Sequence, residues 1–258
     1  TYTTQSVQSH WQAVRDGLYG VGVQRHLGQQ YPAVVDEMLP LRDASAFPNS
    51  NMRHLLWGET WREAGTIIAT TFLGLSPTSA EFRILDDSLK YVDYFAIGSY
   101  TSPQLYKRRD AAGNFLPLND QSWPPDLDRV PAETEPETVY FTVAVPRKEV
   151  SVRAQGKPAP VVILGHGYGG NRFPVMQFAG YLARHGLATI SIDGPSHGIG
   201  LEPGPDQLAR TLLGARGLNA LGTATFLDRA FDQDGNGVKD SGADFWSSYL
   251  FHTRDIVR

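Results

Sequence analysis

The stretch that most constrains the fold is residues 158–193, PAPVVILGHGYGGNRFPVMQFAGYLARHGLATISID. It opens with a continuous apolar run, Val161–Leu164, which is typical of a strand covered on both faces in a parallel sheet. A glycine-dense turn follows, and Asn171 and Pro174 predict a helix start, with a stop at Gly186. Because LATISID then supplies a second buried strand, we expect strand, helix and strand within about 30 residues, the length of one right-handed crossover unit.

The composition indicates a globular protein and excludes several classes of function. The chain has 258 residues, 41% hydrophobic and 19% charged, with a formal net charge of -4 and no cysteine. A chain of that length can bury the hydrophobic core of one large α/β domain, or of one and a half smaller domains. Without a basic stripe we expect no nucleic-acid partner, and no run approaches the roughly 20 apolar residues of a transmembrane segment. The lack of cysteine excludes disulfides, thiolate metal sites and a cysteine nucleophile.

We expect residues 1–136 to form a mixed α+β region of uncertain fold, which precedes a second region, residues 137–258. Apolar residues recur at helical spacing from Val7 to Leu18, which predicts an amphipathic helix. EAGTIIATTFLGL and YVDYFAIGSY predict strands or buried segments, and they indicate no function. Residues 107–136 are rich in Pro, Asp and Asn and predict a hairpin or a long loop at the boundary. The alternation over 139–145 then predicts a strand.

From about Val139 to Arg258 the sequence resembles the α/β-hydrolase fold, specifically bacterial exported esterases and lipases with a long N-terminal region. The resemblance implies a mostly parallel sheet with crossover helices, of which this chain holds the first half. In that family the strand ending in His-Gly carries part of the oxyanion hole. The resemblance therefore implies that Gly167 and Tyr168 form this loop, that Tyr168 donates its backbone amide, and that His166 has a structural role. Backbone amides fixed in such a loop stabilise the negative charge of acyl transfer; the alternative is a tight turn before a helix.

The motif GPSHG at 194–198 matches G-x-S-x-G, the nucleophile elbow of serine hydrolases. An elbow needs a helix that begins directly at the serine, whereas HGIGLEPGPDQ follows Ser196 and its glycines and prolines predict no helix there. In the related family the elbow also comes later in the order of strands. We therefore interpret Ser196 as a coincidental match and not as the nucleophile.

The segment Trp246–Val257 has apolar residues at helical spacing, and by resemblance it is the helix that precedes the elbow strand. The nucleophile, the acid and the catalytic histidine are then expected beyond Arg258. The chain is accordingly expected to be a fragment, completed by the remainder of the same polypeptide or by a second chain.

A second candidate site is FDQDGNGVKDSGAD, residues 231–244. Oxygen-bearing residues fall at positions 1, 3, 5, 7 and 9 of a calcium loop, and a glycine provides the sharp turn at position 6. The predicted ligands are Asp232, Asp234, Asn236, the Val238 carbonyl and Asp240. Ala243 replaces the usual glutamate at position 12, and Asp244, one residue later, is expected to close the shell. We expect structural Ca2+ of about millimolar affinity; the alternative is a solvated Asp-Gly turn. The loop lies in an insertion at about 199–245, where the family places lids, so calcium would order a lid or tie down a long loop.

The expected function is a serine carboxylic-ester hydrolase, esterase- or lipase-like, that cleaves a small-molecule or lipid ester through an acyl-enzyme. One alternative is a prolyl-oligopeptidase-like serine peptidase, although residues 1–138 lack the repeat of a propeller. Another is a non-catalytic, calcium-stabilised surface module on a hydrolase fold. The calcium loop, the lack of cysteine and the resemblance together indicate a bacterial protein that is extracellular, on the cell surface or periplasmic. No organic cofactor is implied.

Overall fold

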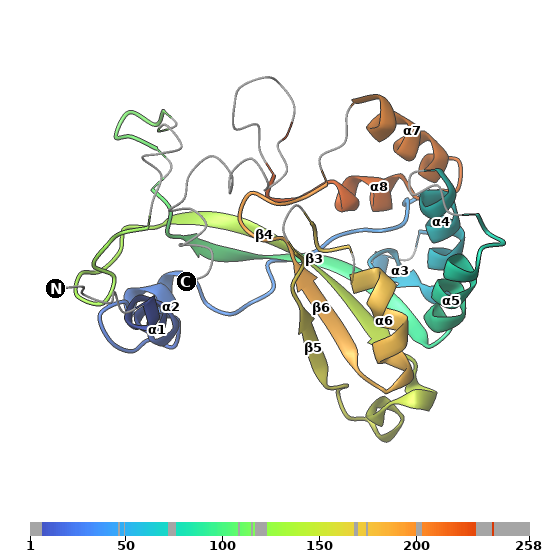
Figure 1. The fold of residues 1–258 in the computed structure, drawn as a ribbon, viewed down its shortest axis with the longest axis horizontal. Coiled ribbons are helices and arrows are strands. Elements are labelled where there is room, and N and C mark those ends of the chain that lie inside the picture. Colours follow the sequence, from blue (N-terminus) through green and yellow to red (C-terminus); the bar gives the residue numbers. More distant parts are fainter. Residues whose placement is uncertain are drawn as a thin grey trace. The chain divides into compact units, whose positions relative to one another are not determined.

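The structure is a computed structural model. It describes residues 7–45, 47–48, 50–71, 76–107, 109–114, 116, 123–167, 170–173, 175–199, 203–230 and 239. Helices and strands alternate in a mixed α/β arrangement (Figure 1). The helices are α1 (Val7–Leu18), α2 (His26–Gln30), α3 (Ser50–Arg53), α4 (Gly58–Thr71), α5 (Ala80–Leu89), α6 (Val175–Arg184), α7 (Pro203–Gly214) and α8 (Asn219–Thr225), with 3-10 turns at Lys148–Val150 and Val152–Gln155. The strands are β1 (Glu37–Met38), β2 (Leu56–Trp57), β3 (Val92–Gln104), β4 (Glu135–Pro146), β5 (Val161–Leu164) and β6 (Ala188–Ile192).

The strands form one mixed sheet in the order β1-β3-β4-β6-β5, with β2 also paired to β3. β1 and β2 each run antiparallel to β3, and β4 runs antiparallel to β6. β5 and β6 are parallel, with Val161 opposite Ala188, and α6 is the crossover between them, as residues 158–193 predict. A mostly parallel sheet was expected, and the described sheet is mixed instead. Among the described strands, β5 and β6 are joined by a single crossover helix and are parallel, whereas two helices, α4 and α5, lie between β2 and β3, and these strands pair antiparallel.

Local sequence patterns predict some elements correctly and miss others. The helix at Val7–Leu18 is confirmed as α1, and YVDYFAIGSY lies almost wholly in β3. The expectation of a strand in EAGTIIATTFLGL is wrong as far as Thr71, because these residues belong to α4, and of the alternative, a buried segment, Ala64 is fully buried. Trp61 and Ala64 lie three residues apart and are both buried, so the helical period prevails over the β-branched residues that follow.

Contacts divide the chain into two compact units, and each combines segments from both sides of the expected boundary at 136–137. One unit takes residues up to Asp36 together with Tyr100–Val139, and the other takes Glu37–Ser99 and continues from Tyr140. In the first unit the buried side chain of Gln24 donates to the Leu127 carbonyl over 2.6 Å and accepts from the Ala132 amide over 2.8 Å. The part of the long loop around residues 127–132 is thus held to the turn between α1 and α2 by hydrogen bonds from one side chain to the loop backbone.

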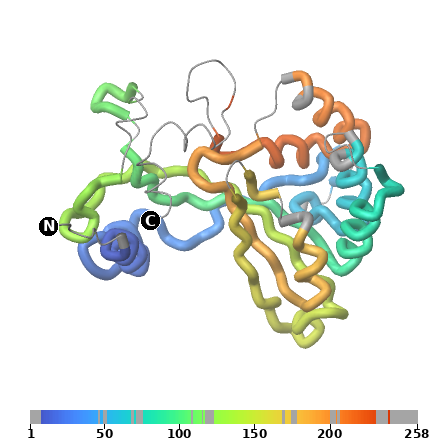
Figure 2. Tube along the Cα trace, viewed as in Figure 1, coloured from blue at the N-terminus to red at the C-terminus, as the bar shows by residue number. Residues whose placement is uncertain are grey.

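The core of the second unit lies between the sheet and its helices. Phe95 and Ile97 of β3 are buried together with Leu89 of α5, Ala179 of α6 and Leu221 of α8. α5 packs against α6, α7 packs against α8, and α7 also contacts α4. Figure 2 shows the orange segment of α7 and α8 beside the helices that precede β3. No described helix has the length and apolar character to cross a membrane.

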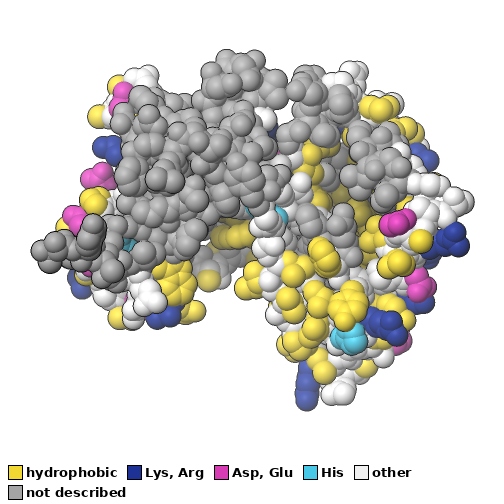
Figure 3. Space-filling view, viewed as in Figure 1, with side chains coloured by type: hydrophobic (Ala, Val, Ile, Leu, Met, Phe, Trp, Pro, Cys, Tyr) yellow, Lys and Arg dark blue, Asp and Glu magenta, His cyan; other side chains and the backbone are white. Residues whose placement is uncertain are grey.

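β5 ends the described sheet, and its apolar residues are largely exposed. Val161 is 58% exposed and Ile163 is 79% exposed, whereas the apolar run predicted a strand covered on both faces. Phe178 and Tyr181 of α6 are also exposed, and hydrophobic side chains gather over β5 and α6 in Figure 3. The prediction of two covered faces is wrong for the described chain, because Val161 and Ile163, which point to one face of the strand, are exposed, while Val162 and Leu164 on the other face are partly buried.

Candidate active site

The carboxyl ends of β5 and β6 bring two loops together. The strands are parallel and in register, with Leu164 opposite Ser191, so residues 165–173 and 193–199 leave the sheet at the same edge. Ligands of open α/β sheets bind outside the carboxyl ends of the strands. These two loops, with the side chains that hold them, therefore form the candidate site.

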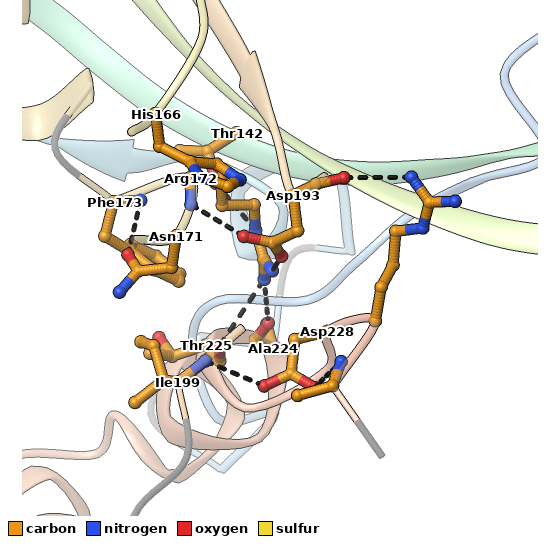
Figure 4. Close-up of polar contacts among 12 residues, drawn as sticks. Thr142, His166, Asn171, Arg172, Phe173, Asp193, Ile199, Ala224, Thr225 and Asp228 are labelled. Carbon is orange, nitrogen blue, oxygen red and sulfur yellow. Dashed lines mark hydrogen bonds and ion pairs between the residues drawn. The ribbon is translucent and has the colours of Figure 1, made fainter. Parts of the chain in front are cut away.

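The imidazole of His166 bridges the two loops (Figure 4). His166 Nε2 accepts a hydrogen bond from the amide of Gly194 over 2.7 Å, and Nδ1 lies 2.9 Å from the Gly167 carbonyl. Because an amide donates and a carbonyl accepts, Nε2 is unprotonated and Nδ1 carries the proton. Both ring nitrogens are thus engaged with backbone groups, which gives His166 a structural role and not that of a general base.

A buried ion pair fixes the next part of the same loop. Arg172 and Asp193 have side chains 0% and 1% exposed, and Arg172 Nη1 contacts Asp193 Oδ2. The backbone amide of Arg172 donates to Asp193 Oδ1 over 2.6 Å, and Nε donates to Thr142 Oγ1 over 3.2 Å. A charged pair that is removed from water needs such additional bonds to offset its desolvation. Loop 165–173 is therefore attached to loop 193–199 at both His166 and Arg172 (Figure 4).

Ser196 lies in a turn that does not have the features of a nucleophile elbow. Its φ is 61°, a left-handed conformation, and the residue is 6% exposed. α7 begins at Pro203, not at Ser196. It does begin inside the stretch for which the sequence predicted no helix, because a proline at the first helical position lacks only an amide that has no helical partner. The serine hydroxyl is thus neither at a helix N-terminus nor well exposed to a substrate.

His197, the next residue, is fully buried beside His166, with ring centroids 4.8 Å apart. Its Nδ1 lies 2.8 Å from the Pro195 carbonyl and therefore carries the proton. Burial lowers the pKa of His197. The Pro195 carbonyl and Asp193 oppose this change, whereas His166 and Arg229 add to it. Neutral His197 thus serves to shape the loop.

Asp228 binds the C-terminal end of loop 193–199. Its carboxylate accepts from the amides of Ile199, over 3.0 Å, and Ala230, over 3.1 Å, and it pairs with Lys239 Nζ at 3.0 Å. Burial raises the pKa of this carboxyl group, while Lys239 and the Ala230 amide act in the opposite direction. A Cβ at Gly198 would lie 2.2 Å from Asp228 Cγ, so glycine is required for this close approach.

The structure places one of the two predicted oxyanion-loop residues. Gly167 lies in the exposed loop at the carboxyl end of β5, and its carbonyl accepts from the Gly170 amide over 3.0 Å. Apart from its chain neighbours, no atom of the described residues would lie within 4 Å of a Cβ built at Gly165 or at Gly167, so the described part of the chain leaves the space beside these glycines open. Tyr168 lies outside the described residues and stays a prediction.

The predicted calcium ligands also lie outside the described residues; they are Asp232, Asp234, Asn236, Val238, Asp240 and Asp244. Within the described ranges, no cluster of three or more His, Asp or Glu side chains is placed to hold a metal ion. The calcium loop therefore stays a prediction.

Sequence reasoning missed Arg172, Asp228 and Thr142. Arg172 follows the glycine turn as one more polar residue, and arginine is rarely fully buried. One usable signal was the Asp at the end of LATISID, because a carboxylate that leaves a buried strand needs a partner.

No family model matches the chain, and no curated protein matches it. Among solved structures, the chain is similar to a PEG-bound complex of a cold-adapted esterase from an Arctic intertidal metagenomic library, with 18% identity and a TM-score of 0.20. The match covers 47% of this chain and 46% of that esterase, so the chain spans less than half of its length.

Proposed function

We propose that this chain carries the oxyanion-hole loop of a serine carboxylic-ester hydrolase. The observation that supports the proposal best is the contrast within loop 165–173. Its flanking residues His166 and Arg172 are bonded to the neighbouring loop, whereas Gly167 between them is exposed beside open space. A loop with fixed ends and an exposed glycine at the carboxyl end of a parallel pair suits the binding of a reacting carbonyl group.

The proposed chemistry uses backbone amides of this loop. When a serine attacks an ester, the carbonyl oxygen becomes an oxyanion, and rigid amides stabilise it without reorganising during the reaction. Tyr168 is the proposed donor, and Gly167 leaves room for the substrate to approach. The substrate is a small-molecule or lipid ester, and the reaction passes through an acyl-enzyme that water hydrolyses.

The nucleophilic serine is proposed to come from outside residues 1–258, from the rest of the polypeptide or from a second chain. The left-handed, buried Ser196 is not suited to the role, because a nucleophile must reach the substrate and have a base beside it. The two neighbouring histidines are engaged with backbone groups and not with the Ser196 hydroxyl: His197 Nδ1 bonds to the Pro195 carbonyl, and both ring nitrogens of His166 are hydrogen-bonded.

We also propose structural calcium at residues 232–244. Lys239 falls at position 8, between ligand positions, and its ammonium group pairs with Asp228. This ion pair therefore uses none of the proposed ligands. Export from a bacterial cell is part of this proposal, since extracellular calcium is abundant enough for a weak site.

The test is covalent labelling of the natural full-length protein with a fluorophosphonate probe, followed by peptide mapping. Capture on a serine outside residues 1–258, together with hydrolysis of p-nitrophenyl esters, supports the proposal. Capture with cleavage of peptide substrates but not of simple esters supports the serine peptidase. Capture on Ser196 contradicts the assignment of the nucleophile. Failure of the folded protein to react supports the non-catalytic surface module.

A further inference from the structure

The guanidinium group of Arg172 reaches beyond the two loops to helix α8. Its Nη2 donates to the carbonyl of Ala224 over 2.9 Å and to that of Thr225 over 3.4 Å. These carbonyls lie in the last turn of the helix, where no amide within the helix can bond to them. A cation at this end also interacts favourably with the helix dipole. One side chain therefore holds both Asp193 and the end of α8 (Figure 4).

Asp43 holds the opposite end of the same helix. Its Oδ2 accepts from the amide and the side-chain nitrogen of Asn219, over 3.2 and 3.0 Å, and Oδ1 accepts from the Ala220 amide over 2.9 Å. Its own amide donates to the Gly217 carbonyl over 3.1 Å. A carboxylate at the first amides satisfies donors that the helix leaves open. α8 thus has an acid at its first turn and a base at its last, both supplied from outside the α7–α8 segment.

The burial of Arg172 makes this arrangement strict. With both side chains of the ion pair removed from water, loss of Asp193 would leave the arginine charge without compensation, and loss of the α8 carbonyls would leave buried N–H donors without acceptors. The fork of an arginine can serve Asp193, Thr142 and the α8 carbonyls at once, whereas the single ammonium group of a lysine cannot. A displacement of α8 would therefore disturb the bonds that hold loop 165–173.

We propose that Arg172 is a positioning residue that makes the placement of α8 and the conformation of loop 165–173 interdependent. The proposal rests on the proposed function, in which this loop supplies an oxyanion donor. Correct placement of α8 is then needed to orient that donor. On this proposal, helices α7 and α8 hold the loop in position and do not open as a lid.

Hydrogen exchange of the natural full-length protein tests the coupling without reference to catalysis. Asp43→Ala releases the first turn of α8 but touches no atom of loop 165–173. We expect amide exchange to rise about tenfold in residues 219–226 and several-fold in 165–173, with the central residues of β3 unchanged. Asp86→Ala is the matched control, because it removes the Arg62–Asp86 pair of the same unit and should leave both segments unchanged. A rise confined to 219–226 would overturn the proposal.

Steady-state kinetics of the full-length protein test the consequence for catalysis. In Arg172→Lys we expect kcat per fluorophosphonate-titrated site to fall about tenfold, with KM changed less than about twofold, because a misaimed oxyanion donor acts on the transition state. A smaller number of titrated sites with normal kcat at each site would mean a role in folding alone and would overturn the proposal. If Arg172→Lys does not fold, the same measurement on Asp43→Ala decides. An inactive wild-type protein would contradict the proposed function, and the exchange result would still decide the coupling.

Discussion

The amide of Gly194 donates to His166 Nε2 over 2.7 Å, and this bond joins the loop after β6 to the loop after β5. We expect His166→Phe to lower the free energy of unfolding by about 1–3 kcal/mol, because a phenyl ring leaves the partly buried amide without an acceptor. His166→Gln can place Oε1 where Nε2 lies and should cost less than about 1 kcal/mol. Urea titration of the three proteins measures the difference. Equal losses in both variants would show that the bond contributes nothing.

Mutation can distinguish the two interpretations of Ser196, as the nucleophile or as a residue of the turn, because its φ of 61° is left-handed. Ser196→Gly removes the hydroxyl and also the Cβ that makes this conformation unfavourable. We expect unfolding free energy to stay the same or rise by up to about 1 kcal/mol, while Ser196→Ala, which keeps the Cβ, gives no gain. Both variants should react with fluorophosphonate as the wild type does. Loss of labelling in both would make Ser196 the nucleophile.

Local patterns predicted β5, α6 and β6, because an apolar run, a glycine turn and an amphipathic helix lie within one short stretch. The antiparallel pairing of β4 with β6 could not be predicted in this way, since nothing near Phe141 specifies its partner Ile192. The same holds for the polar core of the site. Arg172 and Asp193 are 21 residues apart, and burial of an arginine becomes favourable only when tertiary structure assembles all its partners.

The opposite pKa changes of His197 and Asp228 predict how stability depends on pH. Because burial lowers the pKa of His197 in the folded protein, the unfolded chain takes up this proton first as pH falls below about 6.5. His197 therefore contributes a loss of stability on acidification, at most about 1.4 kcal/mol per pH unit. The raised pKa of Asp228 acts in the opposite sense at lower pH, where the folded protein binds its proton first.

Thermal or urea unfolding of wild type and His197→Asn between pH 7 and 5 checks this prediction. The asparagine amide can still donate to the Pro195 carbonyl but does not titrate. We expect the wild type to lose more stability than the variant over this range. Parallel curves for the two proteins would show that His197 is not the group responsible.

Calcium should stabilise the protein if residues 232–244 bind it. For a site of about 1 mM affinity, 10 mM Ca2+ adds about 1.4 kcal/mol, which corresponds to a rise of about 3–5 °C in Tm for a chain of this size. Magnesium at the same concentration should have little effect, because Mg2+ demands tighter octahedral geometry. Asp234→Asn removes one charged ligand and should weaken the response. An unchanged Tm of the wild type at 10 mM Ca2+ would remove calcium from the proposal.

The proposed oxyanion donor is a backbone amide, so only a substitution that removes that N–H tests it directly. Tyr168→Pro lacks the donor, and we expect kcat for ester hydrolysis by the full-length protein to fall about 100- to 1000-fold. Tyr168→Phe keeps the amide and the ring and should retain kcat within about threefold, which separates the amide from the side chain. Circular dichroism and Tm establish that the proline variant is folded. If the folded proline variant hydrolyses esters at the wild-type rate, the oxyanion hole is formed by other groups, and loop 165–173 serves the fold alone.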